Sequence, residues 1–338
     1  MTRCLITGAS GFVGSNLARR LCADGWLVRC LVRPTSRLEL LESLNVDFAY
    51  GSLDDPASLR NAAAGVDVVF HLAGRVAALR SHEFTRDNVE GTRQLAKACA
   101  LQSAPPAFVM ASSLAAGGVG TLKTPRRESD PDRPVSAYGR SKLAAEQAAI
   151  EAAGDMPMTF IRPPMVFGQG DRARLQMFLG MKVLPVHVSP GLRRFPLSVV
   201  HVTDLCDALV RIAQRGERIT GRDAPHAAPG TGRYYVAADR HVTYAQLGVL
   251  AARAAGWAVA PLPLPKPVFW FAGSLGEVAG RLRGRPGIVN LDKVREATAK
   301  GWVCCDDKIR SQLDYRPAAP LEQRFAETVA WYRHHGWL

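Results

Sequence analysis

Short apolar runs rich in β-branched residues alternate with helix-like segments through the first half of this 338-residue chain. This alternation is typical of parallel strands joined by crossover helices. It predicts an α/β fold with a doubly wound parallel sheet. We expect strands at 3–7, 27–32, 46–50, 66–72, 107–112 and 158–163, and helices that begin near Phe12, Ser36, Pro56, Asn88 and Tyr138.

After Pro163 the pattern becomes less regular, and segments such as PPMVFGQGD (163–171) and HAAPGTG (226–232) have the composition of loops. We therefore predict a sheet domain over 1–163. A strand and helix at 199–215 are expected to rejoin it. The remaining residues, 164–198 and 216–338, would form a smaller, discontinuous C-terminal lobe that binds the substrate.

Three glycines, Gly8, Gly11 and Gly14, follow the first predicted strand in the segment TGASGFVG (7–14). The first glycine permits a tight turn, the second lets the backbone approach a pyrophosphate, and the third lets the helix pack on the strand. The free amides at the helix start favour an anion. The pattern predicts a Rossmann domain that binds NAD(P), with further contacts from Ser10, Phe12 and Val13; the alternative is a tight turn without a ligand.

The end of the second predicted strand indicates which nicotinamide cofactor binds. An NAD enzyme usually carries an acidic residue there, for the ribose 2′-hydroxyl. This chain instead has Arg33, Ser36 and Arg37 in the segment LVRPTSR (31–37). These side chains suit a 2′-phosphate, so we predict NADP(H) in preference to NAD(H). The alternative is that Arg33 is solvated or stacks on adenine.

Tyr138 and Lys142 stand four residues apart in SAYGRSKLAAEQA (136–148), on one face of a predicted helix. The ammonium can lower the pKa of the phenol while binding a ribose hydroxyl, which makes Tyr138 a general acid or base. Ser113 ends the fifth predicted strand, at the sheet edge where ligands bind. These three residues are the predicted catalytic site for the transfer of a hydride and a proton to or from a ketone or secondary alcohol. The alternative is that Tyr138 and Lys142 lie on a solvated helix face and have no catalytic role.

Together these segments resemble the extended short-chain dehydrogenase/reductase family, which includes nucleotide-sugar epimerases and dehydratases. The resemblance covers nearly the whole chain and rests on TGASGFVG (7–14), HLAG (71–74), DNVEGT (87–92), the serines at 112–113, YGRSK (138–142), IRPPMVFGQGD (161–171), HVTDL (201–205) and TVAWYRHHGWL (328–338). It implies that Ser113, Tyr138 and Lys142 are catalytic and that Asn88 maintains the geometry of the site. The further cofactor positions that it implies are Ser52, Leu53, Leu72, Ala73, Gly74, Pro163 and Val166.

Within this family the chain is most similar to the branch of hydroxysteroid dehydrogenases and dihydroflavonol reductases. Ala116, Gly117 and Gly118 replace the bulkier residues of many members, which suggests room for a bulky, apolar substrate. The main alternative is a nucleotide-sugar epimerase or dehydratase with bound NAD. Such enzymes tend to carry an arginine where this chain has Leu197, although Arg193 and Arg194 are nearby. A second alternative is a regulatory protein that senses NADP(H) without chemistry.

The net charge of +13 is dispersed along the chain, and no nucleic-acid motif accompanies it, so we predict no nucleic-acid partner. The seven cysteines lack metal-ligand spacing, so we predict reduced thiols and no metal. The start of the chain lacks the features of a signal peptide, which predicts a cytoplasmic location. The segment 261–285 is apolar with basic residues at its end; it would cover an apolar pocket, lie on a membrane surface, or pack as an ordinary helix. We also expect a homodimer and a small-molecule substrate.

Overall fold

A seven-stranded parallel sheet forms the centre of the computed structural model, which describes residues 1–191, 195–284, 287 and 290–338. The strand order is β11-β6-β5-β4-β1-β2-β3, and every neighbouring pair runs parallel. The chain therefore winds outwards in both directions from β1, as in a Rossmann fold. The strands are β1 (Arg3–Thr7), β2 (Leu27–Val32), β3 (Val46–Tyr50), β4 (Val68–His71), β5 (Ala107–Ala111), β6 (Met158–Arg162) and β11 (Arg233–Tyr235).

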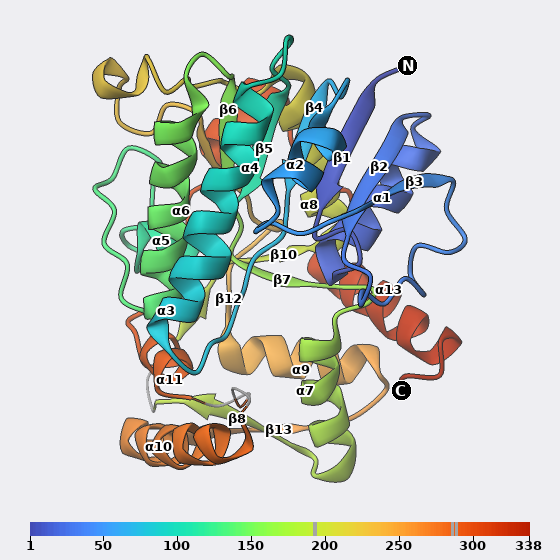
Figure 1. The fold of residues 1–338 in the computed structure, drawn as a ribbon. Helices are drawn as coiled ribbons and strands as arrows, with labels where there is room; N and C mark the ends of the chain where they lie inside the picture. The colour runs from blue at the N-terminus through green and yellow to red at the C-terminus, as the bar shows by residue number, and fades with distance from the viewer. Residues whose placement is uncertain (192–194, 285–286, 288–289) are drawn as a thin grey trace.

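Helices cover both faces of this sheet (Figure 1). Cys4 and Ile6 pack with α1 (Phe12–Ala23) and α8 (Val202–Arg215) on one face. Leu5, whose side chain points the other way, packs with α2 (Pro56–Ala63), α4 (Gly91–Ala100) and α6 (Ala137–Ala153). Because successive side chains of a strand alternate between faces, a strand buried on both sides must be apolar at nearly every position. This explains the continuous apolar runs in the sequence.

The six predicted strands of the first half are present, with bounds that differ by at most two residues at either end. Asp55 accepts hydrogen bonds from the amides of Ala57 and Ser58 and so caps α2, and Pro56 is its first residue. The helix expected near Ser36 is wrong: residues 34–35 form a turn, in which the Arg33 amide donates to Ser36 Oγ at 3.0 Å. The helix expected near Asn88 begins earlier, as α3 (Ser81–Phe84), and continues through a π-helical turn, Thr85–Glu90 (η1).

The strand of segment 199–215 does not join the central sheet. β10 (Val199–His201) pairs with β7 (Met165–Phe167) in a separate two-stranded sheet, while α8 packs against α1. The seventh strand of the central sheet is instead β11, which lies within the range 216–338 that the sequence assigned to the second lobe. Its three residues are too few to show a periodic pattern in the sequence.

A second group of elements packs around its own apolar core and forms the lower part of the molecule in Figure 1. Within the described ranges, no helix is long and apolar enough to cross a membrane.

The elements outside the central sheet and its covering helices are α5 (Leu114–Gly117), α7 (Arg172–Val183), β8 (Val186–Pro190), β9 (Pro196–Leu197), η2 (Ala224–His226), β12 (Val242–Thr243), α9 (Tyr244–Ala254), β13 (Ala260–Leu264), α10 (Lys266–Arg283), α11 (Leu291–Ala297), α12 (Asp307–Leu313) and α13 (Leu321–His334).

Candidate functional site

The predicted site residues follow the carboxyl ends of the central strands. Because these strands are parallel, their carboxyl ends lie along one edge of the sheet, where ligands bind in doubly wound folds. The glycine segment follows β1, Arg33 follows β2, and Ser52 and Leu53 follow β3. Leu72, Ala73 and Gly74 follow β4, Ser113 follows β5, and Pro163 follows β6, whereas Val166 lies in the separate strand β7.

The glycine segment between β1 and α1 is shaped to admit a phosphate. Gly8 has a φ of +70°, and an ideal Cβ built on it would lie 2.7 Å from the Ala73 nitrogen. A Cβ on Gly14 would lie 2.2 Å from the Gly8 oxygen, so this glycine allows the helix to approach the strand. Gly11 is the N-cap of α1 and has no side chain to bond the first amides of the helix. These amides suit a pyrophosphate, and the turn therefore fits a dinucleotide cofactor.

A buried chain of hydrogen bonds, which the sequence did not reveal, fixes the loop that faces this turn. Thr7 Oγ1 accepts a hydrogen bond from the Ala73 amide at 3.2 Å and contacts His71 Nδ1 at 2.7 Å. His71 Nε2 in turn contacts Thr92 Oγ1 at 2.8 Å. Burial, together with the nearby Lys142, lowers the pKa of His71 to about 3, so the ring is neutral. His71 therefore holds the loop in place.

Arg33 and Arg37 are exposed at the end of β2. Neither side chain forms an ion pair with a carboxylate in the described part of the chain. Ser36 is half-buried, and its hydroxyl accepts the Arg33 amide. Beside them, the Ser52 hydroxyl at the end of β3 hydrogen-bonds Asp54. Two uncommitted guanidinium groups thus stand where the adenosine ribose of a dinucleotide lies in this fold.

Tyr138 and Lys142 lie one turn apart on α6, and Ser113 is the N-cap of α5. Ser113 Oγ accepts the Ala115 amide at 3.1 Å, and Ser113 lies near enough to Tyr138 to lower the pKa of its phenol. Lys142 Nζ donates to the Ala111 carbonyl at 2.8 Å, and it would lie 3.6 Å from an ideal Cβ on Gly74. The structure therefore brings these three side chains together beside the loop that follows β4.

The surroundings of Tyr138 set the protonation state of its phenol. Burial raises it to about 12, against a lowering by the hydrogen bond with Ser113, while the negative charge of Glu296 raises it further. The Lys142 ammonium, one turn along α6, donates to the Ala111 carbonyl. Burial lowers the pKa of Lys142 itself to about 8, and the charge of Glu146 opposes that lowering. Tyr138 is therefore protonated at neutral pH.

Asn88 joins the loop after β4 to α6. Its Oδ1 accepts the Arg75 amide at 2.6 Å, and its Nδ2 donates to the Arg75 carbonyl at 3.0 Å and to Ser141 Oγ at 2.9 Å. Ser141 is adjacent to Lys142 on α6. The side chain lies on the π-helical turn and is buried. This arrangement positions α6 against the cofactor loop.

Helix α11 from the second lobe packs on the start of α6, a contact that the sequence did not predict. Asp292 accepts the amides of Ala137 at 2.6 Å and Tyr138 at 3.1 Å. Glu296 accepts the Ser136 hydroxyl at 2.7 Å. Lys293 Nζ lies 4.8 Å from the centre of the Tyr138 ring. The position of Tyr138 thus depends on residues more than 150 positions away.

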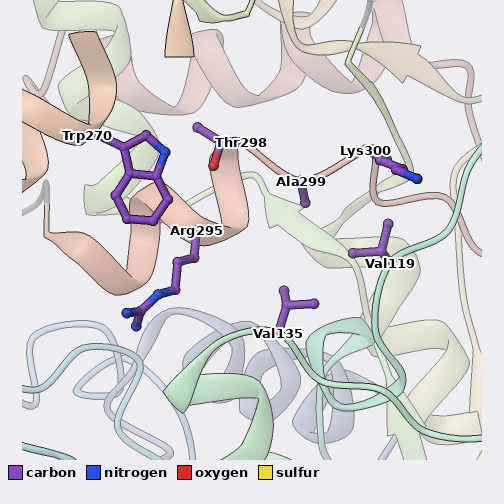
Figure 2. Close-up of a pocket in the computed structure, with 7 residues that line it drawn as sticks. All are labelled: Val119, Val135, Trp270, Arg295, Thr298, Ala299 and Lys300. Carbon is purple, nitrogen blue, oxygen red and sulfur yellow. The ribbon is translucent and has the colours of Figure 1, made fainter. Parts of the chain in front are cut away.

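A pocket of about 400 Å³ lies beside this contact. Figure 2 shows Trp270 of α10 and Arg295 of α11 on one side of it, with Lys300, Val119 and Val135 around the remainder. Val135 directly precedes the N-cap of α6. The pocket therefore adjoins the end of the helix that carries Tyr138, and two of its lining side chains are cationic.

The segment after Ser113 does not provide the extra room that the sequence suggested. Ala116, Gly117 and Gly118 are all buried. An ideal Cβ on Gly117 would lie 2.0 Å from Tyr235 Oη, and one on Gly118 would lie 2.3 Å from the Arg133 carbonyl oxygen. The missing side-chain volume is thus filled by Tyr235 and by backbone, and it does not widen a substrate site.

A buried ion network supports the far end of the catalytic region. Arg162 on β6 binds Glu146 on α6 through two contacts, of 2.8 and 2.7 Å, and both side chains are almost wholly buried. Asp132 accepts two further bonds from the same guanidinium, at 2.6 and 3.0 Å. Arg233 on β11 contacts Glu146 at 3.2 Å. The network ties α6 to the two strands at one edge of the sheet.

The comparisons with known proteins agree with this fold. Residues 4–224 match the model of the NAD dependent epimerase/dehydratase family. A ceramide reductase of Caulobacter vibrioides is 31% identical over 98% of this chain and 95% of that protein. A UDP-glucose 4-epimerase of Vibrio cholerae is 28% identical, over 96% and 94% of the two chains. The crystal structure of gox2253 covers 100% of both chains, with 26% identity and a TM-score of 0.77.

The family model and these relatives have one cofactor fold in common, and their named activities are reduction and epimerisation. Together with the dinucleotide turn, they make this chain an enzyme of the NAD(P)-dependent oxidoreductase and epimerase class. It belongs to the NAD-dependent epimerase/dehydratase family, within the extended short-chain dehydrogenases/reductases.

Proposed function

We propose that the enzyme uses NADPH to reduce a ketone on a long-chain, apolar substrate of the ceramide class to a secondary alcohol. The observation that carries this proposal is the convergence of Ser113, Tyr138 and Lys142 beside the cofactor loop, with the phenol held protonated. The 31% identity to a ceramide reductase over nearly the whole chain supports the substrate class.

The chemistry divides between the cofactor and the three side chains. Bound NADPH supplies a hydride to the carbonyl carbon. Tyr138 donates its proton to the carbonyl oxygen, and Ser113 donates a hydrogen bond to the same oxygen and so orients it. The Lys142 ammonium stabilises the phenolate that remains, which then regains a proton from solvent. The ketone gains one hydride and one proton, which gives the alcohol.

The pKa of Tyr138 favours the direction of reduction. A phenol whose pKa is raised to about 12 by burial is protonated at neutral pH and acts as a general acid. Oxidation of an alcohol would need the phenolate as a base, which this environment disfavours. We therefore expect reduction to be the faster direction at neutral pH.

The exposed guanidinium groups of Arg33 and Arg37 support NADPH over NADH. They stand at the end of β2 with no carboxylate partner among the described residues, so both remain available to a 2′-phosphate. An acidic residue at this position would repel that phosphate.

The region around Leu197 argues against a sugar nucleotide. Leu197 replaces the arginine that such epimerases tend to carry, and here it is buried in the core of the second lobe. A buried leucine cannot contact a diphosphate. Arg193 and Arg194, the nearest replacements in the sequence, lie outside the described residues.

The alternative, an epimerase, is favoured by one feature of the structure and by one comparison. Lys293 lies over the Tyr138 ring, and Arg295 and Lys300 line the neighbouring pocket, so cationic groups that suit a diphosphate surround this end of the site. The identity to a UDP-glucose 4-epimerase extends over 96% of the chain. Epimerisation would consume no NADPH overall, which separates the two proposals.

The test is a turnover assay on the purified enzyme with a keto-ceramide and with UDP-glucose. We expect NADPH oxidation with the ketone, slower oxidation of NADH, and no conversion of UDP-glucose. Tyr138→Phe should lower kcat by at least about 10²-fold, because it removes the proton donor. Tyr244→Phe, whose hydroxyl makes no hydrogen bond in the described structure, is the matched control. Conversion of UDP-glucose without net NADPH oxidation would assign the epimerase function instead.

A further inference from the structure

Helix α10 presents its large apolar side chains to solvent and its small residues to the protein. Val268, Phe271, Leu275, Val278 and Leu282 are 45, 69, 56, 56 and 84% exposed. Their alternating spacing of three and four residues places them on one face of the helix. The buried residues of α10 are Gly273 and Gly280, and an ideal Cβ on Gly273 would lie 2.6 Å from Val294 of α11. Packing against the protein therefore uses the glycine face and leaves the apolar face uncovered.

The uncovered face is larger than scattered surface residues would explain. An 18-residue helix is roughly 27 Å long, and the apolar residues extend over most of that length. Contiguous exposed apolar surface of this kind usually marks a contact with another molecule or with a membrane. The helix lies at the outer edge of the second lobe, at the bottom of Figure 1, where a flat surface can reach it.

The charges around this face indicate what covers it. Arg281 and Arg283 stand in the last turn of the helix, whereas the ammonium of Lys266, its first residue, donates to the Thr298 carbonyl of the protein. Glu277, the one acidic residue of α10, is only 19% exposed and lies 3.4 Å from Arg281. A symmetric contact with a second copy would bring together two chains that each carry a net charge of +13. An anionic lipid surface pairs with the same charges.

We propose that α10 is an interfacial anchor, which lies on an anionic membrane surface with its apolar face among the lipid chains. Trp270, 39% exposed, belongs to both the helix and the pocket beside the start of α6, a pocket that Arg295 and Lys300 also line (Figure 2). A lipid ketone would then have a short route from the bilayer to the region of Tyr138. The docking itself does not depend on the identity of the substrate.

The test is co-sedimentation of the full chain with vesicles of phosphatidylglycerol and phosphatidylcholine, and with vesicles of phosphatidylcholine alone. We expect binding to the anionic vesicles, with weaker binding at high salt. Phe271→Ser with Leu275→Ser should weaken partitioning at least about tenfold, because two apolar side chains lose their burial in lipid. The matched control is Leu101→Ser with Leu122→Ser, which changes two side chains that are 67 and 60% exposed elsewhere.

Equal sedimentation of the wild type and the α10 variant, or no binding to anionic vesicles, would overturn the proposal. Sedimentation equilibrium without lipid tests whether a second copy of the chain covers this face instead. If the wild type and the control variant are oligomeric and the α10 variant is monomeric, the face is a self-association surface. Circular dichroism checks that each variant is folded. Because the assay needs neither cofactor nor ketone, its failure would leave the proposed reductase activity untested and intact.

Discussion

Lys142 is a buried amine that the proposed reaction needs in its charged form. Burial lowers its pKa to about 8, from an ordinary 10.5, which shows that the folded protein disfavours the charge. Catalysis should therefore require protonated Lys142 and decline as the pH rises through about 8. A profile of kcat/KM against pH, at saturating NADPH, tests this expectation. A kcat/KM profile that stays flat to pH 10 would show that the reaction does not require Lys142 in its charged form.

The same burial predicts that Lys142→Met inactivates the enzyme and stabilises it. The unfolded chain binds more protons than the folded chain between pH 8 and 10.5, so wild-type stability should rise with pH across this window. The variant lacks this rise, and at pH 7 its free energy of unfolding should be higher by on the order of 2–3 kcal/mol. Urea denaturation at pH 7 and pH 10 measures both effects. A variant less stable than wild type at pH 7 would show that the hydrogen bond to Ala111 outweighs the burial of charge.

Alanine substitutions at Gly11 and Gly14 distinguish the effect of the turn on cofactor binding from its effect on folding. A Cβ on Gly14 would meet the backbone of Gly8 at 2.2 Å, so Gly14→Ala should destabilise the protein by about 2 kcal/mol or more. A Cβ on Gly11 would lie 3.1 Å from the same oxygen, and the φ of −84° suits alanine. Gly11→Ala should therefore fold almost normally. Its Kd for NADPH should nevertheless rise at least about tenfold, because the methyl group occupies the approach of the pyrophosphate. Thermal unfolding and fluorescence titration distinguish the two variants.

At the scale of elements, sequence patterns predict structure well only where the residues that contact one another are also close in the sequence. The turn at 8–14 and the pair Tyr138 and Lys142 are set by spacing within one or two turns of helix, and the sequence predicts both. The helix expected at Ser36 failed because the serine hydroxyl bonds the Arg33 amide and closes a turn after Pro34. Serine favours helix starts and turns alike, so the sequence alone does not distinguish them.

The contact between α11 and α6 predicts that an acidic residue far from the catalytic helix controls its first turn. Asp292→Ala removes the acceptor for the amides of Ala137 and Tyr138, so stability should fall by about 1 kcal/mol. We also expect kcat to fall, because the first turn that places Tyr138 loses a support. Asp55→Ala is the matched control, since Asp55 caps α2 in the same way. Asp55→Ala should lose similar stability with kcat unchanged. If Asp292→Ala and Asp55→Ala have the same kcat, Asp292 stabilises the start of α6 without affecting turnover.

At the scale of the whole molecule, the site combines parts that local sequence patterns cannot connect. The strands β1 to β6 and the glycine turn follow from the first half of the chain. β11 and α11, which contact α6, come from residues beyond 230, where strands are short and loops long. Asp292 and Arg233 show no periodicity or motif that indicates their partners. Their roles depend on tertiary packing, which a single sequence does not reveal.

Glu146 is where this long-range packing meets the catalytic helix. Its wholly buried carboxylate binds Arg162 of β6, whose side chain is 1% exposed, and Arg233 of β11, whose side chain is 21% exposed. Glu146→Gln leaves the guanidinium of Arg162 short of one charged partner, so stability should fall by about 3 kcal/mol or more. Glu151→Gln, on the same helix, breaks a surface pair with Arg93 whose glutamate is 61% exposed, and should change stability by less than about 1 kcal/mol.

The pH profile of the Glu146→Gln variant shows whether this network also serves catalysis. The negative charge of Glu146 raises the pKa of Lys142, in opposition to burial. Its removal should lower that pKa, and the decline of kcat/KM should then begin at a lower pH than in the wild type. A purely structural network would lower stability and leave the midpoint of the profile in place. A midpoint shifted to lower pH, in a variant that is still folded at the assay temperature, would show that Glu146 keeps Lys142 charged.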